Sequence, residues 1–270
     1  MKQMFKRITI AAVVLFVSAC QSTSMYQNSS VVDYLYPKSE NQSVSIEIPR
    51  LTLPLRVGIA FTPGGFSSAA GLTEVKKTEL MSNLSAHFKD LDFVKSIDII
   101  PSDYLRQAGS FENLDQLKRM FNIDVIALVS FDQTKFTDEG LASLAYWTIV
   151  GAYVVPGEKN STHTMLDTVL YDIDSRKMLF RAPGTSSVKS TSTLVNLREQ
   201  TRIDSIKGFD RAGASLAENL KVQLDLFKTK VAESPEAYQI ATSEGYQGSG
   251  STNLLFALLA SLALVRKLKK

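Results

Sequence analysis

The sequence predicts an α/β (α+β) protein with a single main domain, in which helices pack against a mixed sheet. Two observations predict this class. Between about Leu51 and Tyr238, the chain of 270 residues alternates short apolar runs of strand length with stretches whose apolar residues recur at helical spacing. The order of these segments is β-α-β-α-β, followed by a hairpin and a closing helix, which places helices on one or both faces of the sheet.

The first part of the domain contains two strands, each followed by a helix. The first strand is "LRVGIAF" from Leu55, which ends at the turn Thr62-Pro63-Gly64-Gly65. A helix is expected over Gly71–Phe88, with one apolar side made by Leu72, Val75, Leu80, Leu84 and Phe88. The second strand is "FVKSIDII", closed by Pro101, and the second helix spans Glu112–Phe121.

The second part begins with a long strand, "IDVIALVSFDQTKF", which is apolar at first and alternating later, as expected of a strand that starts centrally and ends exposed. A hairpin is predicted from "THTMLDTVLYDID" and "KMLFRAPGTSSVKS", joined by Asp174-Ser175-Arg176. Within it, Val169, Tyr171 and Ile173 share one face. The closing helix is expected over Phe209–Val231, with an apolar stripe of Phe209, Ala212, Leu216, Leu220, Phe227 and Val231.

The segment Ala142–Val155 is the most apolar part of the body and has two interpretations. It completes the core as a buried segment, or it forms a membrane-active or oligomer-forming insertion, for which Tyr146, Trp147 and Tyr153 suit an interfacial belt. A membrane β-strand alternates strictly, and this segment does not. We therefore expect it to lie in the core.

The net charge of +3 comes from the two ends of the chain. Three basic residues precede the first apolar run, four follow the last one, and neither segment contains an acidic residue, so the remaining body carries −4. A mildly acidic body does not provide the basic surface that nucleic-acid binding requires. We expect no nucleic-acid partner.

The amino terminus has the pattern of a secretory signal. Lys2, Lys6 and Arg7 precede the short apolar run Ile8–Val17, which is too short to span a bilayer comfortably. The next residues, Val17-Ser18-Ala19-Cys20, resemble the bacterial lipobox, and Cys20 is the only cysteine. This resemblance implies acylation of Cys20, cleavage between Ala19 and Cys20, and action of lipoprotein signal peptidase and acyltransferases. The alternative is an ordinary secretory signal with a chance cysteine.

The resemblance also has consequences for the location. Several acyl chains anchor a protein stably where one does not. Gln21, rather than aspartate, follows the cysteine. In a Gram-negative cell this implies delivery to the outer membrane, with the protein held by acylated Cys20.

The carboxy terminus carries a second apolar run. Leu254–Val265 would form a helix roughly 18 Å long, against about 30 Å of hydrocarbon. It is preceded by Gly248-Ser249-Gly250-Ser251 and followed by a cluster of arginine and lysine residues. This layout resembles the GlyGly-CTERM sorting signal, which rhomboid-family proteases called rhombosortases process. The alternatives are a plain tail anchor or an amphipathic helix lying on a membrane.

Together, the lipobox and this tail have the layout of the rhombotarget lipoprotein family. The phrases "SSVVDYLYP" and "LPLRVGIAFTPG" support the resemblance. The body, through "NIDVIALVSF" and "LYDIDSRKMLFRA", resembles the α/β domain of curli-export-type lipoproteins and the amino-terminal domain of the TolB translocation protein. Fold alone does not assign function.

No residue pattern predicts catalysis, a metal or a cofactor. His87 and His163 lie outside any nucleophile motif, and a solvated or core-rim histidine is the better interpretation of each. Thr62–Gly71 lies between a strand and a helix, but its glycine spacing fits no phosphate-binding fingerprint. Acidic residues that could bind calcium, but more often end strands, are Asp132 with Asp138 and Glu139, and Asp172 with Asp174.

The expected organisation has five parts. They are a signal peptide at 1–19, a lipidated tether with a docking segment at 20–50, the α/β domain at 51–238, a linker and cleavage region at 239–252, and an apolar helix with a basic tail at 253–270. We expect a non-enzymatic envelope lipoprotein that binds envelope or secreted partners. A subunit of an outer-membrane export pore or ring, and therefore a homo-oligomer, is the alternative, and an enzyme with an unrecognised site is the third.

Overall fold

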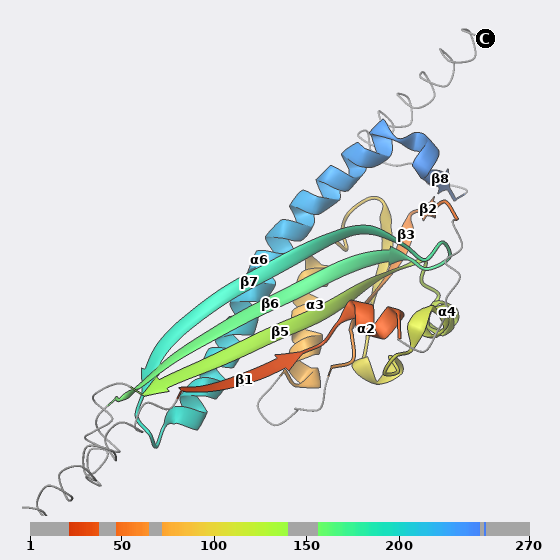
Figure 1. Ribbon diagram of the computed structural model, residues 1–270. Coiled ribbons are helices and arrows are strands. Elements are labelled where there is room, and N and C mark those ends of the chain that lie inside the picture. The colour runs from red at the N-terminus through yellow and green to blue at the C-terminus, as the bar shows by residue number, and fades with distance from the viewer. Residues whose placement is uncertain (1–21, 38–46, 65–71, 140–155, 244–245, 247–270) are drawn as a thin grey trace, which may run out of the picture.

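The computed structural model describes residues 22–37, 47–64, 72–139, 156–243 and 246 (Figure 1). The expectations for the signal peptide and Cys20, for Ala142–Val155, for Gly248–Ser251 and for the apolar tail fall outside these residues. Within them the protein is α/β, as the sequence predicts, with one mixed sheet.

The main sheet has the strand order β4 (Val94–Ile100), β3 (Leu55–Phe61), β5 (Val125–Glu139), β6 (Glu158–Asp172), β7 (Lys177–Ser192). β4, β3 and β5 are parallel, because α-helical crossovers connect them, whereas β5, β6 and β7 are antiparallel. The sheet is therefore mixed. Its parallel part comes from the strand–helix repeats of the first part of the domain, and its antiparallel part comes from the long strand and the hairpin of the second part.

β5 is the central strand and has two neighbours along one edge. Its first residues, Val125–Val129, pair with β3, and its later residues, Asp132–Asp138, pair with β1 (Ser22–Asn28). β3 and β1 therefore lie end to end. Between them Thr62 donates a hydrogen bond from its hydroxyl to that of Ser29 over 3.0 Å, which fixes the junction.

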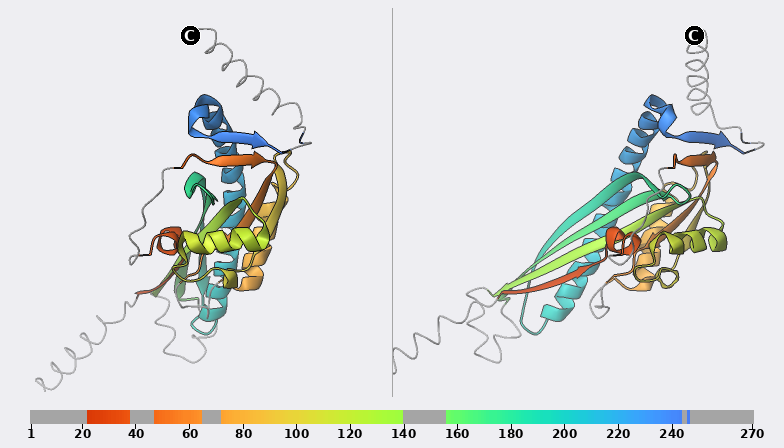
Figure 2. Two further views of the ribbon diagram at one scale, coloured as in Figure 1. Left: turned by 90° about the vertical axis from the view of Figure 1, so that its right-hand side faces the viewer. Right: turned by 45° about the vertical axis from the view of Figure 1, so that its right-hand side comes forward.

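Two helical layers cover the sheet (Figures 1 and 2). α2 (Val31–Leu35) and α4 (Ser110–Phe121) pack on one face, and α3 (Glu74–Ala86) and α6 (Leu197–Glu233) pack on the other. The buried side chains of the first layer include Tyr34, Leu35, Leu114, Leu117, Ile126 and Tyr171. Those of the second layer include Phe61, Met81, Leu84, Val129, Phe209 and Leu216.

The domain extends beyond both expected bounds. The docking segment that the sequence predicts is present, because Val31, Tyr34 and Leu35 are buried in the first layer. However, the preceding residues form strand β1 rather than a tether. At the other end, β8 (Gln239–Thr242) pairs in parallel with β2 (Arg50–Leu53).

The closing helix is also longer than its apolar stripe. α6 begins at Leu197, twelve residues before Phe209. Its first turns cover a polar part of the sheet, where Asp204 accepts a hydrogen bond from the hydroxyl of Ser190 and the Ser205 carbonyl accepts one from Gln133 over 3.3 Å. Because these contacts are polar, the helix there lacks an apolar pattern.

The two ends of the described chain leave the sheet at opposite poles. Ser22 pairs with Asp138, at the tip where Glu139 also pairs with Glu158. Tyr246 packs instead beside β2 and β8, at the other end of β5. Among the helices described here, none combines the length and the apolar character needed to cross a membrane.

Candidate functional site

A cavity of about 520 Å³ lies between the sheet and the pair α3 and α6. Its lining includes Leu51 and Leu53 of β2 and Ile240 of β8. β2 and β8 lie at the pole where α6 extends past the main sheet (Figure 2). The walls of the cavity come from strands β2 to β8 and from the helices α3 and α6. The volume falls within the range of about 300–1,000 Å³ found for small-molecule sites.

The cavity forms because the two helices pack over different strands. α6 packs mainly on β6 and β7, and α3 packs on β3 and β4. They meet near Gly213, where an added Cβ would lie 2.9 Å from Cδ2 of Leu80. Further along α6, Leu220 and Leu224 line the cavity and stay partly exposed, as does Val57 on the opposite wall.

One side chain in the apolar wall is polar and unsatisfied. Thr168, on β6, lines the cavity and is 2% exposed. Its hydroxyl oxygen has no hydrogen-bond partner within the part of the chain that the structure describes. A buried hydroxyl without a partner is costly, so this position is suited to an oxygen atom from a ligand.

The rim of the cavity is aromatic, with charge at its edge. Phe227 contacts Phe180, with ring centroids 5.5 Å apart, and Tyr238 at 5.4 Å. The ammonium of Lys228 lies 5.2 Å from the centroid of the Phe93 ring and pairs with Asp225 at 3.0 Å. The mostly apolar lining is suited to holding an apolar molecule, and its charged residues are Asp92 and Lys228.

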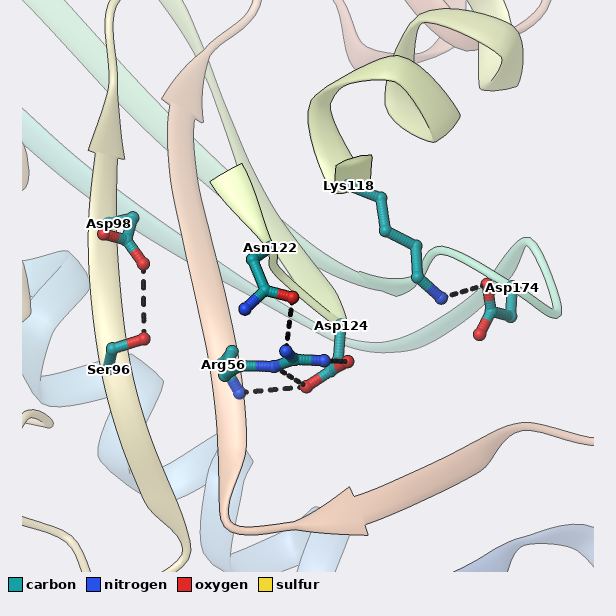
Figure 3. Close-up of polar contacts among 7 residues, drawn as sticks. All are labelled: Arg56, Ser96, Asp98, Lys118, Asn122, Asp124 and Asp174. Carbon is teal, nitrogen blue, oxygen red and sulfur yellow. Dashed lines mark hydrogen bonds and ion pairs between the residues drawn. The ribbon is translucent and has the colours of Figure 1, made fainter. Parts of the chain in front are cut away.

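A polar cluster lies at the start of β3 and β5 (Figure 3). Arg56 donates from Nε and Nη2 to the two carboxylate oxygens of Asp124, over 2.9 and 2.6 Å, and also bonds Asn122. Lys118 and Asp174 form a second ion pair nearby. The Arg56–Asp124 geometry is bidentate and partly buried, which indicates a structural link between the two strands.

This link predicts an acid-sensitive contribution to stability. Burial opposes ionisation of Asp124, but hydrogen bonds and charge from Arg56 outweigh it and lower the pKa of the carboxyl. The stabilisation is therefore present above the unfolded pKa and is lost as the pH falls through the lowered folded pKa.

We expect Asp124→Asn to lower the free energy of unfolding by about 1–2 kcal/mol at neutral pH. The difference from the parent should begin to shrink as the pH falls through the ordinary aspartate pKa of 3.8 and should vanish only below the lowered pKa of the folded protein. Urea titrations at several pH values would measure it. Asp98→Asn is the control, since that carboxylate accepts a bond from a neutral partner, Ser96. A deficit unchanged at low pH would contradict the ionic origin.

The two histidines lie apart. His87 follows the last residue of α3 and is exposed. His163 is exposed on β6, where its Nε2 lies 3.0 Å from the hydroxyl of Ser161 and its ring contacts Phe136 edge-on. Sequence reasoning missed this serine–histidine pair, although the two-residue spacing on a predicted strand places both side chains on one face. The pair lies on a strand face where His163, together with Asp132 and Thr164, borders a small hollow of about 230 Å³.

The acidic pairs have structural roles rather than the geometry of a calcium site. Asp132 and Asp138 are six residues apart on β5, roughly 20 Å along the strand. Asp172 accepts bonds from the backbone and hydroxyl of Ser175 in the hairpin turn, while Asp174 pairs with Lys118. Within the described ranges, no group of three or more histidine, cysteine or acidic residues could hold a metal ion.

The strand–helix loop is described only as far as Gly64. Thr62 bonds Ser29, and Gly64 forms a β-bridge with the same residue. These contacts join β3 to the segment after β1. The remainder of Thr62–Gly71 before Leu72 lies outside the described residues.

No family model and no curated protein matches this chain. Two solved structures that resemble it are PelC dodecamers from Paraburkholderia phytofirmans, one of them a point variant. The variant is 12% identical, with a TM-score of 0.28, over 70% of this chain and 99% of PelC. The other is also 12% identical, with a TM-score of 0.26, over 69% and 97%. Likeness at this level does not assign a function.

Proposed function

We propose that this chain is a non-enzymatic cell-envelope lipoprotein of a Gram-negative bacterium. Acylated Cys20 holds it in the outer membrane, a rhomboid-family protease processes its tail, and its α/β domain binds envelope or secreted partners. The observation that carries the proposal is the position of β1. Ser22 follows Cys20 by two residues and is already paired with Asp138 of the central strand.

The position of β1 would place a lipid anchor on Cys20 directly beside the folded domain. With a single residue, Gln21, between Cys20 and the first strand, the anchor is coupled directly to the tip of the sheet. Several acyl chains on that cysteine would give stable attachment. The domain would then be held at one pole, with the cavity at the other.

Replacing Cys20 with serine should abolish incorporation of a clickable fatty-acid analogue in growing cells. The thiol is the atom that receives the diacylglycerol in the lipobox signals that residues 17–20 resemble. Labelling is measured on the immunoprecipitated protein, with Ser18→Ala, another small residue, as the control. Equal labelling of Cys20→Ser and the parent would contradict the anchor.

The tail is expected to be cut within or just after Gly248–Ser251, which removes Leu254–Lys270. The apolar run is short for an anchor, glycine and serine unwind easily, and the basic end favours a cytoplasmic carboxy terminus. Intact mass of the protein from cells with and without the rhomboid-family protease measures the cut. Mature protein that keeps Lys270 in normal cells would favour a second anchor.

The alternative function, a subunit of an export pore or ring, is favoured by one observation. β7 is the last strand of the main sheet within the described chain, and its outer edge leaves a row of backbone groups available for pairing. The size of the protein in mild detergent discriminates the pore or ring subunit from the partner-binding lipoprotein. A stable ring would favour the pore subunit, and a monomer would favour the partner-binding lipoprotein.

A further inference from the structure

We infer that the cavity between the sheet and the helices α3 and α6 binds the acyl chain of a neutral, single-chain lipid whose carbonyl oxygen accepts a hydrogen bond from Thr168. This inference does not depend on acylation of Cys20 or on processing of the tail. It rests on the size of the cavity, on its apolar walls and on the unsatisfied hydroxyl in one of them.

The size of the cavity corresponds to one long hydrocarbon chain. Protein interiors are close-packed and contain few voids larger than a water molecule, so about 520 Å³ is not an ordinary packing defect. If a methylene group occupies about as much space as a water molecule, ~30 Å³, the cavity holds about 17 such groups. Leu220, Leu224 and Leu170 keep accessible surface toward this space, which a bound chain would cover.

The polar groups of the cavity favour a neutral lipid. Thr168 is an uncharged donor, and a threonine hydroxyl can satisfy a carbonyl oxygen but cannot compensate a buried carboxylate. Asp92 and Lys228 are the charged residues among the described ones that line the cavity, and the ammonium of Lys228 is already engaged by the ring of Phe93 and the carboxylate of Asp225. An ester carbonyl therefore fits better than the ionised end of a fatty acid.

Two occupants supplied by the chain itself fit less well. A helix over Leu254–Val265 would fill roughly 1,400 Å³ as a cylinder of 18 Å by 10 Å, well above the cavity volume. The acyl chains expected on Cys20 start at the far pole. Asp138, the partner of Ser22, is thirteen residues along β5 from Val125 in the cavity wall, which is about 44 Å.

The test uses the full chain in isolated membranes. A monoacylglycerol that carries a diazirine within its acyl chain and a terminal alkyne is added, the sample is irradiated, and labelled peptides are mapped by mass spectrometry. A sample kept in the dark is the control for enzymatic acylation of Cys20, which does not require light. We expect light-dependent labels on peptides that contain Leu51–Leu55 or Leu220–Phe227.

Matched variants make the result specific. Leu224→Trp fills the cavity, and loss of burial for about two methylene groups weakens binding roughly tenfold. Leu226→Trp adds the same bulk on the exposed side of the same helix, where Leu226 is 57% exposed, and should label like the parent. Absence of labels in the parent, or equal labelling of both tryptophan variants, would overturn the inference.

Thr168→Val tests the hydrogen bond. It should reduce labelling by the monoacylglycerol while leaving labelling by an alkane probe of the same length unchanged, which also shows that the variant is folded. An equal effect on both probes would overturn the role of the hydroxyl.

A photo-crosslinking residue, benzoylphenylalanine, at Leu224 identifies other occupants of the cavity. A cross-linked dimer would assign the cavity to a second copy of the chain, and a cross-link to residues 254–265 would assign it to the tail. Either result would overturn the inference of a bound lipid.

Discussion

A chain truncated to residues 51–238 should unfold at a much lower urea concentration than one that spans residues 22–246. The truncation removes β1, α2 and β8, and with α2 it removes three buried side chains, Val31, Tyr34 and Leu35. Burial of each contributes about 1.5–3 kcal/mol, so the loss of roughly 5 kcal/mol or more is comparable with the whole stability of many domains. Circular dichroism during urea titration measures the two midpoints.

Single substitutions in α2 show how much of this loss of stability comes from the buried side chains rather than from shortening the chain. Leu35→Ala, at a position with no exposed surface, should cost about 2–5 kcal/mol in the longer fragment. Val32→Ala, three residues earlier in the same helix but 64% exposed, should change stability by less than about 0.5 kcal/mol. Equal unfolding midpoints for the two fragments would mean that residues 22–36 form a tether after all.

Gly184→Ala should be the most damaging single substitution in the contact between α6 and the sheet. Gly184 lies on β7 directly beneath α6. A Cβ there would lie 2.3 Å from the carbonyl oxygen of Ala212 and 2.5 Å from the backbone nitrogen of Leu216. Both atoms belong to the helix backbone, so the whole helix has to move. We expect a loss of about 3 kcal/mol or more in thermal or urea unfolding.

Gly213→Ala is the matched control in the same interface. Its Cβ would meet only the end of the Leu80 side chain, at 2.9 Å, which can adopt another rotamer. Alanine is also favoured over glycine within a helix by about 1 kcal/mol. The stability of Gly213→Ala should therefore stay close to that of the parent. If both variants lost stability equally, the close approach of the helix backbone at Gly184 would not be the cause.

The elements that were predicted correctly are those whose buried side chains are apolar and recur at regular spacing in the sequence. Val169, Tyr171 and Ile173 lie on one buried face of β6 and the following turn, as their alternation indicates. β1 was missed because "STSMYQN" has no such alternation, and its stability comes from pairing with β5. The first turns of α6 were missed for a related reason: they pack on polar side chains such as Gln133 and Thr164.

The candidate site was less accessible to sequence reasoning. The leucines and phenylalanines that line the cavity have the same spacing as core residues, and only the divergence of α3 from α6 leaves space between them. Thr168 sits among apolar residues of a predicted strand, and its lack of a partner depends on atoms far away in the chain. By contrast, Cys20 and Gly248–Ser251 are linear signals, which are readable without a fold but lie outside the described residues.

The placement of Ser22 and Tyr246 at opposite poles has a consequence for orientation. β5 alone is 15 residues long, or about 50 Å. A molecule inserted in one bilayer by both ends would have to lie with its long axis along the surface, which keeps the pole that contains the cavity close to the membrane. After loss of the tail, the same molecule could pivot about Cys20 and stand upright. The cavity would then lie about 50 Å from the membrane. A single proteolytic cut would therefore change the distance between the cavity and the membrane surface.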